Sequence, residues 1–186
     1  MKEDLEILKK TFGFDKYLSH QEEIIADILS GKDVLAIMPT GGGKSLCYQL
    51  PALIFEGMTI VVSPLIALMQ SQVSQLQLLD INAASLNSSN TYEENQQTLN
   101  LLQKNKLKIL YAAPERLVKQ ETIDLLKDKN ISLLAIDEIH CVSQWGHDFR
   151  KEYLKLHLLQ KELSNVQTIG LTATADKATR KDIVDK

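Results

Sequence analysis

The chain has 186 residues, a formal net charge of −3 and 44% hydrophobic residues. This length accommodates one domain with a substantial core, and this composition excludes a disordered segment. No apolar run approaches the ~20 residues of a membrane span, and the charged N-terminus lacks the apolar stretch of a signal peptide, so we expect a cytoplasmic protein that contacts no membrane. The acidic balance does not favour nucleic-acid binding, so any such binding must come from local loops.

Short apolar runs alternate with segments of helical spacing along the chain. The apolar runs predict strands at 33–38, 58–63, 81–86 (the weakest), 107–112, 132–137 and 166–171. Helices are expected at 65–79, from a Thr91–Glu94 capping box onwards, at 150–163 and at 176–184. This alternation predicts an α/β fold, with a mostly parallel sheet and helices on both faces. Ligands of such sheets bind at the carboxyl ends of the strands.

Two cysteines, Cys47 and Cys141, lie far apart and form no CxxC pair. This spacing argues against a disulfide framework and against a zinc site within the chain. We expect two reduced, mostly buried thiols.

A glycine-rich segment follows the first predicted strand and opens a helix. Its phosphate cradle is expected to consist of Thr40, Gly41, Gly42 and Gly43. Lys44 is expected to reach the β- and γ-phosphates of ATP, and Ser45 to offer its hydroxyl to Mg²⁺ at the positive end of the helix. Met38 stands where the pattern GxxxxGK[ST] has its first glycine. The segment predicts ATP and Mg²⁺ as cofactors.

An acidic pair ends the strand predicted at 132–137. Asp137 is expected to hold Mg²⁺, and Glu138 to orient and activate the attacking water. Most Asp-Glu pairs are solvated helix starts, but this pair follows a buried strand in a chain that already has a phosphate loop. We therefore interpret the pair as catalytic.

Several motifs in order then resemble those of the RecQ family of DNA helicases, which are superfamily 2 enzymes with a DExH box. The matching segments are Met38–Pro51 (motif I), Val62–Val73 (motif Ia), Tyr111–Leu117 (motif Ib), Asp137–His140 (the DExH box), Cys141–Arg150 (the aromatic-rich loop) and Leu171–Asp176 (motif III). The resemblance covers the chain from about Phe12 onwards.

The resemblance implies that residues 1–186 form a first RecA-like P-loop NTPase domain, with an adenine-recognition segment at about 10–30. It implies 3′–5′ translocation on single-stranded DNA and unwinding of duplex DNA in replication, recombination and repair. Family members continue with a second RecA-like domain that supplies an arginine finger, and usually with a zinc-binding module and a winged helix. We find no segment for these here, and so expect a monomeric fragment that binds nucleotide, hydrolyses it very slowly and does not unwind DNA alone.

The aromatic-rich loop is expected to couple DNA binding to ATP hydrolysis. Trp145 and Phe149 would stack on bases, and Arg150 would contact phosphate or relay to the nucleotide. Gln144 and His147 are expected to assist. Core packing is the alternative for both aromatic side chains.

Other strand ends are expected to contact DNA or to link it to the nucleotide. Pro64 and Arg116 would meet the DNA backbone, with an internal ion pair to Glu115 or another acid as the alternative for Arg116. Thr172 and Thr174 resemble the motif III hydroxyls that connect the ATP and DNA sites.

The adenine segment departs from the family pattern. Gln21 would read the edge of the base and Phe14 would stack on it, with core packing as the alternative for Phe14. Leu18 replaces the arginine that usually flanks the base, and His20 is a candidate to compensate.

His140 completes the DExH box and is expected to link the ATP site to neighbouring motifs, unless it is an ordinary buried histidine. Three other functions remain open: an RNA helicase, a nucleotide-dependent scaffold and a metabolite kinase. The aromatic-rich loop argues against the first, the intact phosphate and acidic residues against the second, and the combined motifs against the third.

Overall fold

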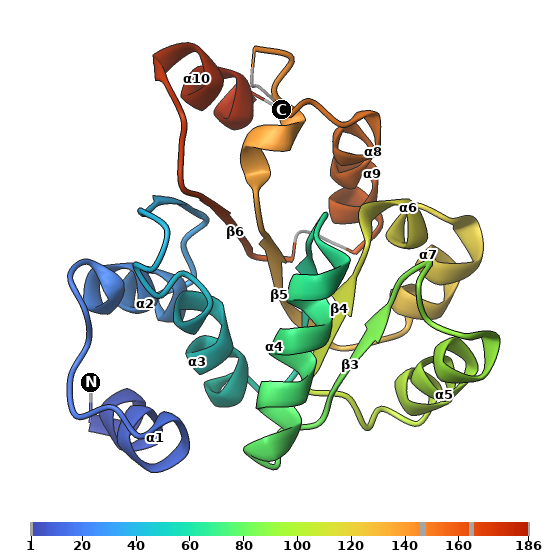
Figure 1. The fold of residues 1–186 in the computed structure, drawn as a ribbon, viewed down its shortest axis with the longest axis horizontal. Coiled ribbons are helices and arrows are strands. Elements are labelled where there is room, and N and C mark those ends of the chain that lie inside the picture. The colour runs from blue at the N-terminus through green and yellow to red at the C-terminus, as the bar shows by residue number, and fades with distance from the viewer. Residues whose placement is uncertain (1, 146–147, 164–165, 186) are drawn as a thin grey trace.

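A six-stranded sheet lies at the centre of the fold in the computed structural model, which describes residues 2–145, 148–163 and 166–185. The strands are β1 (Val34–Ile37), β2 (Met58–Val62), β3 (Ala83–Leu86), β4 (Ile109–Ala112), β5 (Ile131–Ile136) and β6 (Thr168–Thr172). Their order across the sheet is β1-β6-β5-β2-β4-β3, and neighbouring strands are parallel (Figure 1). The predicted α/β class is confirmed, because each predicted apolar run overlaps one of these strands.

Helices connect the strands. They are α1 (Lys2–Phe12), α2 (Gln21–Leu29), α3 (Leu46–Ile54), α4 (Ile66–Leu78), α5 (Tyr92–Gln103), α6 (Pro114–Leu117), α7 (Gln120–Lys127), α8 (Lys151–Leu154), α9 (Leu156–Glu162) and α10 (Lys177–Asp185), with a 3₁₀ turn η1 (Ile139–Val142) after β5. Parallel strands need such crossovers, which place helices on both faces of the sheet.

The two faces of the sheet bury separate apolar clusters. Successive residues of a strand point to opposite faces. Val61 therefore packs under α2, α3 and α4, whereas Ile60 and Val62 pack under α5, α7, α8 and α9. The result is three layers, with β2 buried on both sides (Figure 1).

Two terminal helices lie outside the main layers. Leu8 of α1 is fully buried against Ile25, Leu46 and Leu50, which belong to α2 and α3. At the other end α10 packs beside η1, near the carboxyl edge of the sheet (Figure 1). Asp176 caps α10 by accepting a hydrogen bond from the Thr179 N–H at 2.7 Å.

Most predicted helices are present, and one needs correction. The Thr91–Glu94 capping box forms as expected at the start of α5. The single helix predicted at 150–163 is wrong, since α8 and α9 are separated at Lys155. There the Lys155 N–H donates to the Glu152 carbonyl at 3.1 Å, a bond between residues three apart that tightens the turn and interrupts the α-helical pattern. Helices α1, α2, α6 and α7 were not predicted from the sequence.

No helix in the described part of the chain is long and apolar enough to cross a membrane.

Candidate active site

The glycine-rich turn connects the end of β1 to the start of α3, as the sequence predicted. Gly41 and Gly43 have φ angles of 80° and 75°, a left-handed conformation that glycine adopts without strain. The Gly42 N–H donates to the Pro39 carbonyl at 2.9 Å and closes the turn. Thr40 and Gly41 are exposed, so this part of the cradle is open to a ligand.

Lys44 and Ser45 follow the turn and are both half-buried. The Lys44 ammonium lies 3.5 Å from the Met38 carbonyl, so it folds back over the turn. Ser45 occupies the N-cap position of α3, at the helix end that carries a partial positive charge. The two side chains thus flank the positive end of the helix.

Asp137 lies directly after β5 and is 8% exposed. Burial, with the charge of Glu138 as the next cause, raises the pKa of Asp137 to about 6, while the Lys44 charge opposes this rise. Because β6 alone separates β1 from β5 and all three are parallel, Lys44 and Asp137 emerge at the same edge of the sheet. The Asp137 carboxylate also accepts a hydrogen bond from the Glu138 N–H at 3.0 Å, and Tyr153 donates its hydroxyl to the Asp137 carbonyl at 2.9 Å.

A chain of hydrogen bonds joins the DExH turn to motif III. The Glu138 backbone is left-handed at φ 50°, and its carboxylate lies 3.2 Å from His140 Nδ1. The same ring nitrogen lies 2.8 Å from the Thr172 hydroxyl at the end of β6. Thr172 donates in turn to the Thr174 carbonyl at 3.0 Å and accepts from the Thr174 N–H at 3.2 Å. His140 is therefore buried and held between Glu138 and motif III, and its role as a link between sites stays a prediction.

The aromatic-rich loop leaves η1 and returns at Arg150. The Trp145 side chain is 76% exposed, which excludes core packing, and the Trp145 backbone N–H donates to the buried Ser143 hydroxyl at 3.2 Å. Gln144 is exposed and Phe149 is partly buried, whereas His147 lies outside the described residues. The Arg150 guanidinium donates to Asp148 at 3.1 Å, a pairing that motif reasoning missed.

Two further loops at this edge carry the other predicted DNA contacts. Pro64 is half-buried after β2, and its neighbour Ser63 is buried. Arg116 lies in α6 after β4, and its Nε is buried without a hydrogen-bond partner. Among the residues that the structure describes, Arg116 forms no ion pair with Glu115 or with another acid, so the internal ion pair considered for it is not present there.

Known proteins share these features. The sequence profile described as DEAD/DEAH box helicase matches residues 18–183. The chain belongs to this helicase family. The RecQ helicase of Haemophilus influenzae is 49% identical over 97% of the chain, and the probable helicase RecS of Bacillus subtilis is 47% identical over 96%. The resemblance to RecQ helicases is thus confirmed, and the chain spans only 29% and 36% of the length of these two relatives.

Solved helicase structures share the fold of this domain. A hypothetical ATP-dependent RNA helicase from Sulfolobus tokodaii superimposes with a TM-score of 0.74 at 25% identity, covering all of this chain and 54% of that one. The DUF1998 helicase MrfA, bound to DNA and AMPPNP, gives a TM-score of 0.75 at 20% identity, covering 99% of this chain and 28% of that one. The predicted RecA-like fold is confirmed.

The adenine segment of this helicase domain braces the phosphate turn. Gln21 is 2% exposed, donates its amide to the Gly43 carbonyl at 3.0 Å and accepts from the Leu18 N–H at 2.8 Å. An amide keeps one further donor and one further acceptor position beyond these bonds, and the reading of adenine by Gln21 stays a prediction. Phe14 is 54% exposed, which excludes core packing and leaves its ring open to a base.

Two glycines of the turn make a matched test of this brace. A methyl group at Gly43 would lie 2.2 Å from the Gln21 amide nitrogen, whereas nothing lies near one at Gly41. We expect Gly41→Ala to cost only about 1–2 kcal/mol of backbone strain. Gly43→Ala should cost about 1–3 kcal/mol more, because Gln21 loses its buried partners. Urea unfolding of both variants measures the difference, and equal destabilisation would show that the Gln21 contact does not brace the turn.

A buried polar network was also missed by motif reasoning. The Tyr111 hydroxyl lies 3.2 Å from that of Tyr48 and accepts from the Gln49 amide at 3.0 Å. Gln49 also donates to Gln72 of α4 at 2.7 Å. Helix α3, which starts at the phosphate turn, is thereby joined to β4 and α4. Tyrosines in an apolar run carry no sequence signal that distinguishes such a network from ordinary packing.

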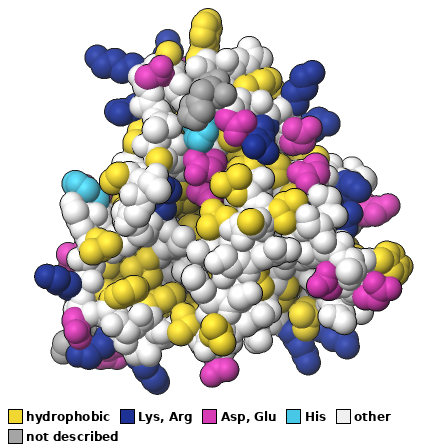
Figure 2. All heavy atoms as spheres, viewed as in Figure 1, with side chains coloured by type: hydrophobic (Ala, Val, Ile, Leu, Met, Phe, Trp, Pro, Cys, Tyr) yellow, Lys and Arg dark blue, Asp and Glu magenta, His cyan; other side chains and the backbone are white. Residues whose placement is uncertain are grey.

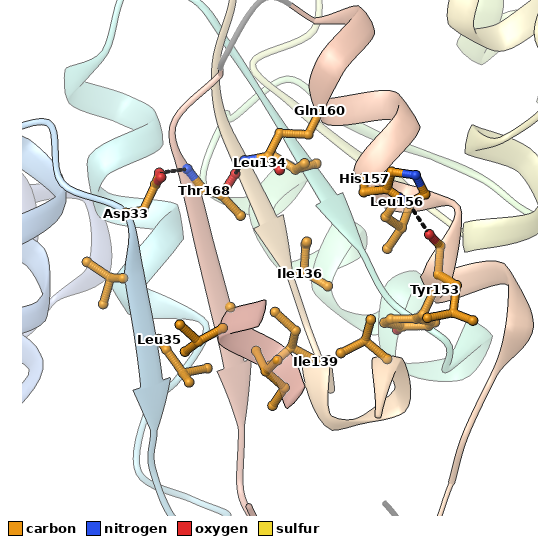
Figure 3. A pocket seen from close by; sticks show the side chains of 16 residues that line it. Asp33, Leu35, Leu134, Ile136, Ile139, Tyr153, Leu156, His157, Gln160 and Thr168 are labelled. Atoms are coloured by element: carbon orange, nitrogen blue, oxygen red, sulfur yellow. Dashed lines mark hydrogen bonds between the residues drawn. The ribbon is translucent and has the colours of Figure 1, made fainter. Parts of the chain in front are cut away.

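An apolar hollow of about 350 Å³ lies between the sheet and helices α8, α9 and α10 (Figure 3). Ile139 and Tyr153 form part of its wall, so the hollow lies next to the DExH turn. At its rim Asp33 accepts a hydrogen bond from the Thr168 N–H at 2.7 Å. No residue of the glycine-rich turn lines the hollow, which therefore lacks the donors that a triphosphate needs.

The charges on one face are mixed. In Figure 2 the Lys and Arg side chains lie mostly towards the rim and alternate with Asp and Glu. This face carries no continuous basic stripe, in agreement with the acidic net charge. Contacts to nucleic acid would depend on individual loops.

Proposed function

We propose that the chain is the ATP-binding half of a 3′–5′ DNA helicase, which couples ATP hydrolysis to translocation and unwinding in replication, recombination and repair. The observation that carries this proposal is that Lys44 lies at the same sheet edge as Asp137 and influences its charge, next to the hydrogen-bonded Glu138, His140 and Thr172. Such an edge presents phosphate donors and a carboxylate to the same ligand.

The residues at this edge fit a Mg²⁺ ion. A carboxylate and a hydroxyl are oxygen donors of the kind that Mg²⁺ prefers, and Asp137 and Ser45 would hold it. The buried Asp137 lacks a full counter-charge, since its pKa remains raised despite Lys44. When bound, Mg²⁺ would neutralise charge on the β- and γ-phosphates.

The chain's own residues would bind the phosphates, hold the adenine and activate the attacking water. Thr40, Gly41, Gly42 and Gly43 would cradle the phosphates, and Lys44 would bind the β- and γ-phosphates. Phe14 and Gln21 would hold the adenine. Glu138 would orient and deprotonate the attacking water, and His140 would position Glu138. Through its hydrogen bond to Thr172, His140 would also connect the ATP site to Thr172 and Thr174 of motif III.

Lys44→Ala tests the phosphate site. We expect ATP affinity to fall by roughly 10–100-fold, because a charge-assisted bond contributes about 1.5–3 kcal/mol. Titration with a fluorescent ATP analogue in excess Mg²⁺ measures the change. Lys32→Ala is the control, since Lys32 pairs with Asp27 at the exposed end of α2 and should leave affinity unchanged. Equal affinity of the Lys44 variant and the unmodified chain would disprove the assignment.

The DNA contacts belong to the same proposal. Trp145 and Phe149 would stack on bases, while Arg150, Arg116 and Pro64 would meet the backbone. Support comes from the exposure of Trp145 and from the unpaired Nε of Arg116. The substrate would be single-stranded DNA beside a duplex.

Trp145→Ala should weaken binding of single-stranded DNA by about 1–3 kcal/mol, the contribution of one stacked base. Fluorescence anisotropy of a labelled oligonucleotide measures it. Tyr92→Ala provides the control, because Tyr92 is an equally exposed aromatic residue, at 74%, on α5. If both variants bind DNA as tightly as the unmodified chain, the stacking role is refuted.

The domain would work as part of a longer, monomeric protein in the cytoplasm. The matched region is only 29% and 28% of the length of two relatives named RecQ, which supports further domains that complete the ATPase. ATP turnover of the longer protein with single-stranded DNA and with RNA of the same sequence tests the whole proposal. Stimulation by DNA is expected; stimulation by RNA alone would favour an RNA helicase, and no stimulation by either would favour a scaffold or a metabolite kinase.

A further inference from the structure

Three side chains of different chemistry meet beside the DExH turn. One ring nitrogen of His140, the thiol of Cys141 and one carboxylate oxygen of Asp148 all lie within 4.8 Å of one another. The Cys141 sulfur is 3.7 Å from Asp148 Oδ2. Imidazole, thiolate and carboxylate are the ligands that bind Zn²⁺ in proteins.

The spacing of these atoms approaches that of a tetrahedral zinc site. Zinc–ligand bonds of about 2.0–2.3 Å place two tetrahedral ligands about 3.5 Å apart. The Cys141–Asp148 pair is already at this separation, and the longest separation in the set needs a shift of about 1 Å, within reach of a side-chain rotation. We infer that His140, Cys141 and Asp148 form a binding site for one Zn²⁺ ion, distinct from the proposed Mg²⁺ site, with water as the fourth ligand.

The site is largely preorganised. His140 is 6% exposed, and its ring orientation is fixed by the Thr172 hydroxyl and the Glu138 carboxylate. Such partners commonly orient a histidine that binds metal. Cys141 is fully buried in η1, whereas the Asp148 side chain is 46% exposed and provides the route of entry.

Two features oppose zinc binding: the proton on the Cys141 thiol and the hydrogen bond from Arg150 to Asp148. The charge of the ion can offset both. Burial, and then the neighbouring Asp148, raise the pKa of the Cys141 thiol to about 12, so zinc must displace its proton. Arg150 also donates to the same Asp148 oxygen that faces Cys141. A thiolate and a carboxylate together neutralise one dication, and Arg150 then shifts to the other carboxylate oxygen or is released.

The site joins two parts that the proposed function assigns to ATP and to DNA. His140 and Cys141 follow the acidic pair, whereas Asp148 lies beside Phe149 in the aromatic-rich loop. Bound zinc would therefore hold this loop against the DExH turn. This consequence rests on the proposed function, but the binding site itself does not.

Cobalt provides the direct test, because Co²⁺ occupies zinc sites and a thiolate ligand gives it a charge-transfer band in the near ultraviolet. The reduced chain is titrated with Co²⁺ in excess Mg²⁺, and then with Zn²⁺ to displace the cobalt. We expect one ion per chain, visible bands typical of tetrahedral cobalt, and bleaching by one equivalent of zinc.

The two cysteines make a matched pair of variants. Cys141→Ser should abolish the charge-transfer band, whereas Cys47→Ser should keep it, because Cys47 is buried in α3 beside Met38. Asp148→Asn, at a surface position that does not endanger the fold, should weaken zinc affinity at least 10-fold, since even outer partners of a zinc site contribute about 10–100-fold.

Circular dichroism of each variant confirms that it is folded. A band that survives in Cys141→Ser, or that vanishes only in Cys47→Ser, would overturn the proposal. Zinc affinity unchanged in a folded Asp148→Asn would do the same. These readouts use no ATP or DNA, so the zinc site and the helicase function can fail separately.

Discussion

Glu138→Gln lowers the rate of ATP hydrolysis by roughly 10²–10⁴-fold, the contribution of a general base. Glutamine keeps the size of the side chain but cannot accept a proton from the attacking water. The structure places the Glu138 carboxylate beside the Asp137 metal ligand proposed above and 3.2 Å from His140 Nδ1. The loss should therefore appear in the chemical step, with ATP affinity changed little.

Single-turnover hydrolysis of labelled ATP resolves this loss even where turnover is slow. It is measured in the longer protein with single-stranded DNA and in the 186-residue chain. Glu56→Gln is the matched control, because Glu56 is exposed just before β2, at the opposite edge of the sheet. An unchanged rate in Glu138→Gln would remove the water-activating role and would favour a binding module over an ATPase.

Asp137→Asn should stabilise the ligand-free chain by about 3 kcal/mol at pH 7 and above. The pKa of Asp137 rises from 3.8 to about 6 on folding, chiefly through burial, and this rise corresponds to about 3 kcal/mol. The folded chain holds this proton more tightly than the unfolded chain does. Stability is therefore lost as the pH rises from about 4 to about 6, and the loss is complete above that window.

Asparagine is uncharged, so its advantage should vanish near pH 4. Urea unfolding of the unmodified chain and of Asp137→Asn between pH 4 and pH 8 measures this difference. Asp80→Asn, at an exposed turn after α4, should leave stability unchanged across the range. A constant difference between Asp137→Asn and the unmodified chain at all pH values would show that the buried charge is not its cause.

The same substitution separates stability from function. A metal ligand that is destabilising when ionised and alone is expected at a site built to receive a cation. Asp137→Asn should therefore be more stable without ligand and gain less stability from Mg²⁺ and ATP than the unmodified chain does. The gain is read as the shift in unfolding temperature at saturating nucleotide.

Local patterns along the chain determined the fold class and the nucleotide motif. The run Met58–Val62 is apolar at every position except Thr59, a near-continuous pattern typical of a strand that is buried on both faces. The glycine-rich turn and the acidic pair were recognisable because each needs a few adjacent residues between a strand and the next element. The break at Lys155 escaped prediction, because apolar spacing continues across it and only the hydrogen-bond pattern changes.

Tertiary structure alone decided which distant groups meet. The strand order places β6 between β1 and β5, so Thr172 reaches His140 across 32 positions of sequence. Gln21 supports Gly43 across 22 positions, and Asp148 lies 3.7 Å from the Cys141 sulfur. The zinc site inferred above contains a single cysteine, so the lack of a CxxC pair in the sequence could not reveal it. Side-chain contacts of this kind depend on strand order and loop path, and these are set by the packing of the whole chain rather than by neighbouring residues.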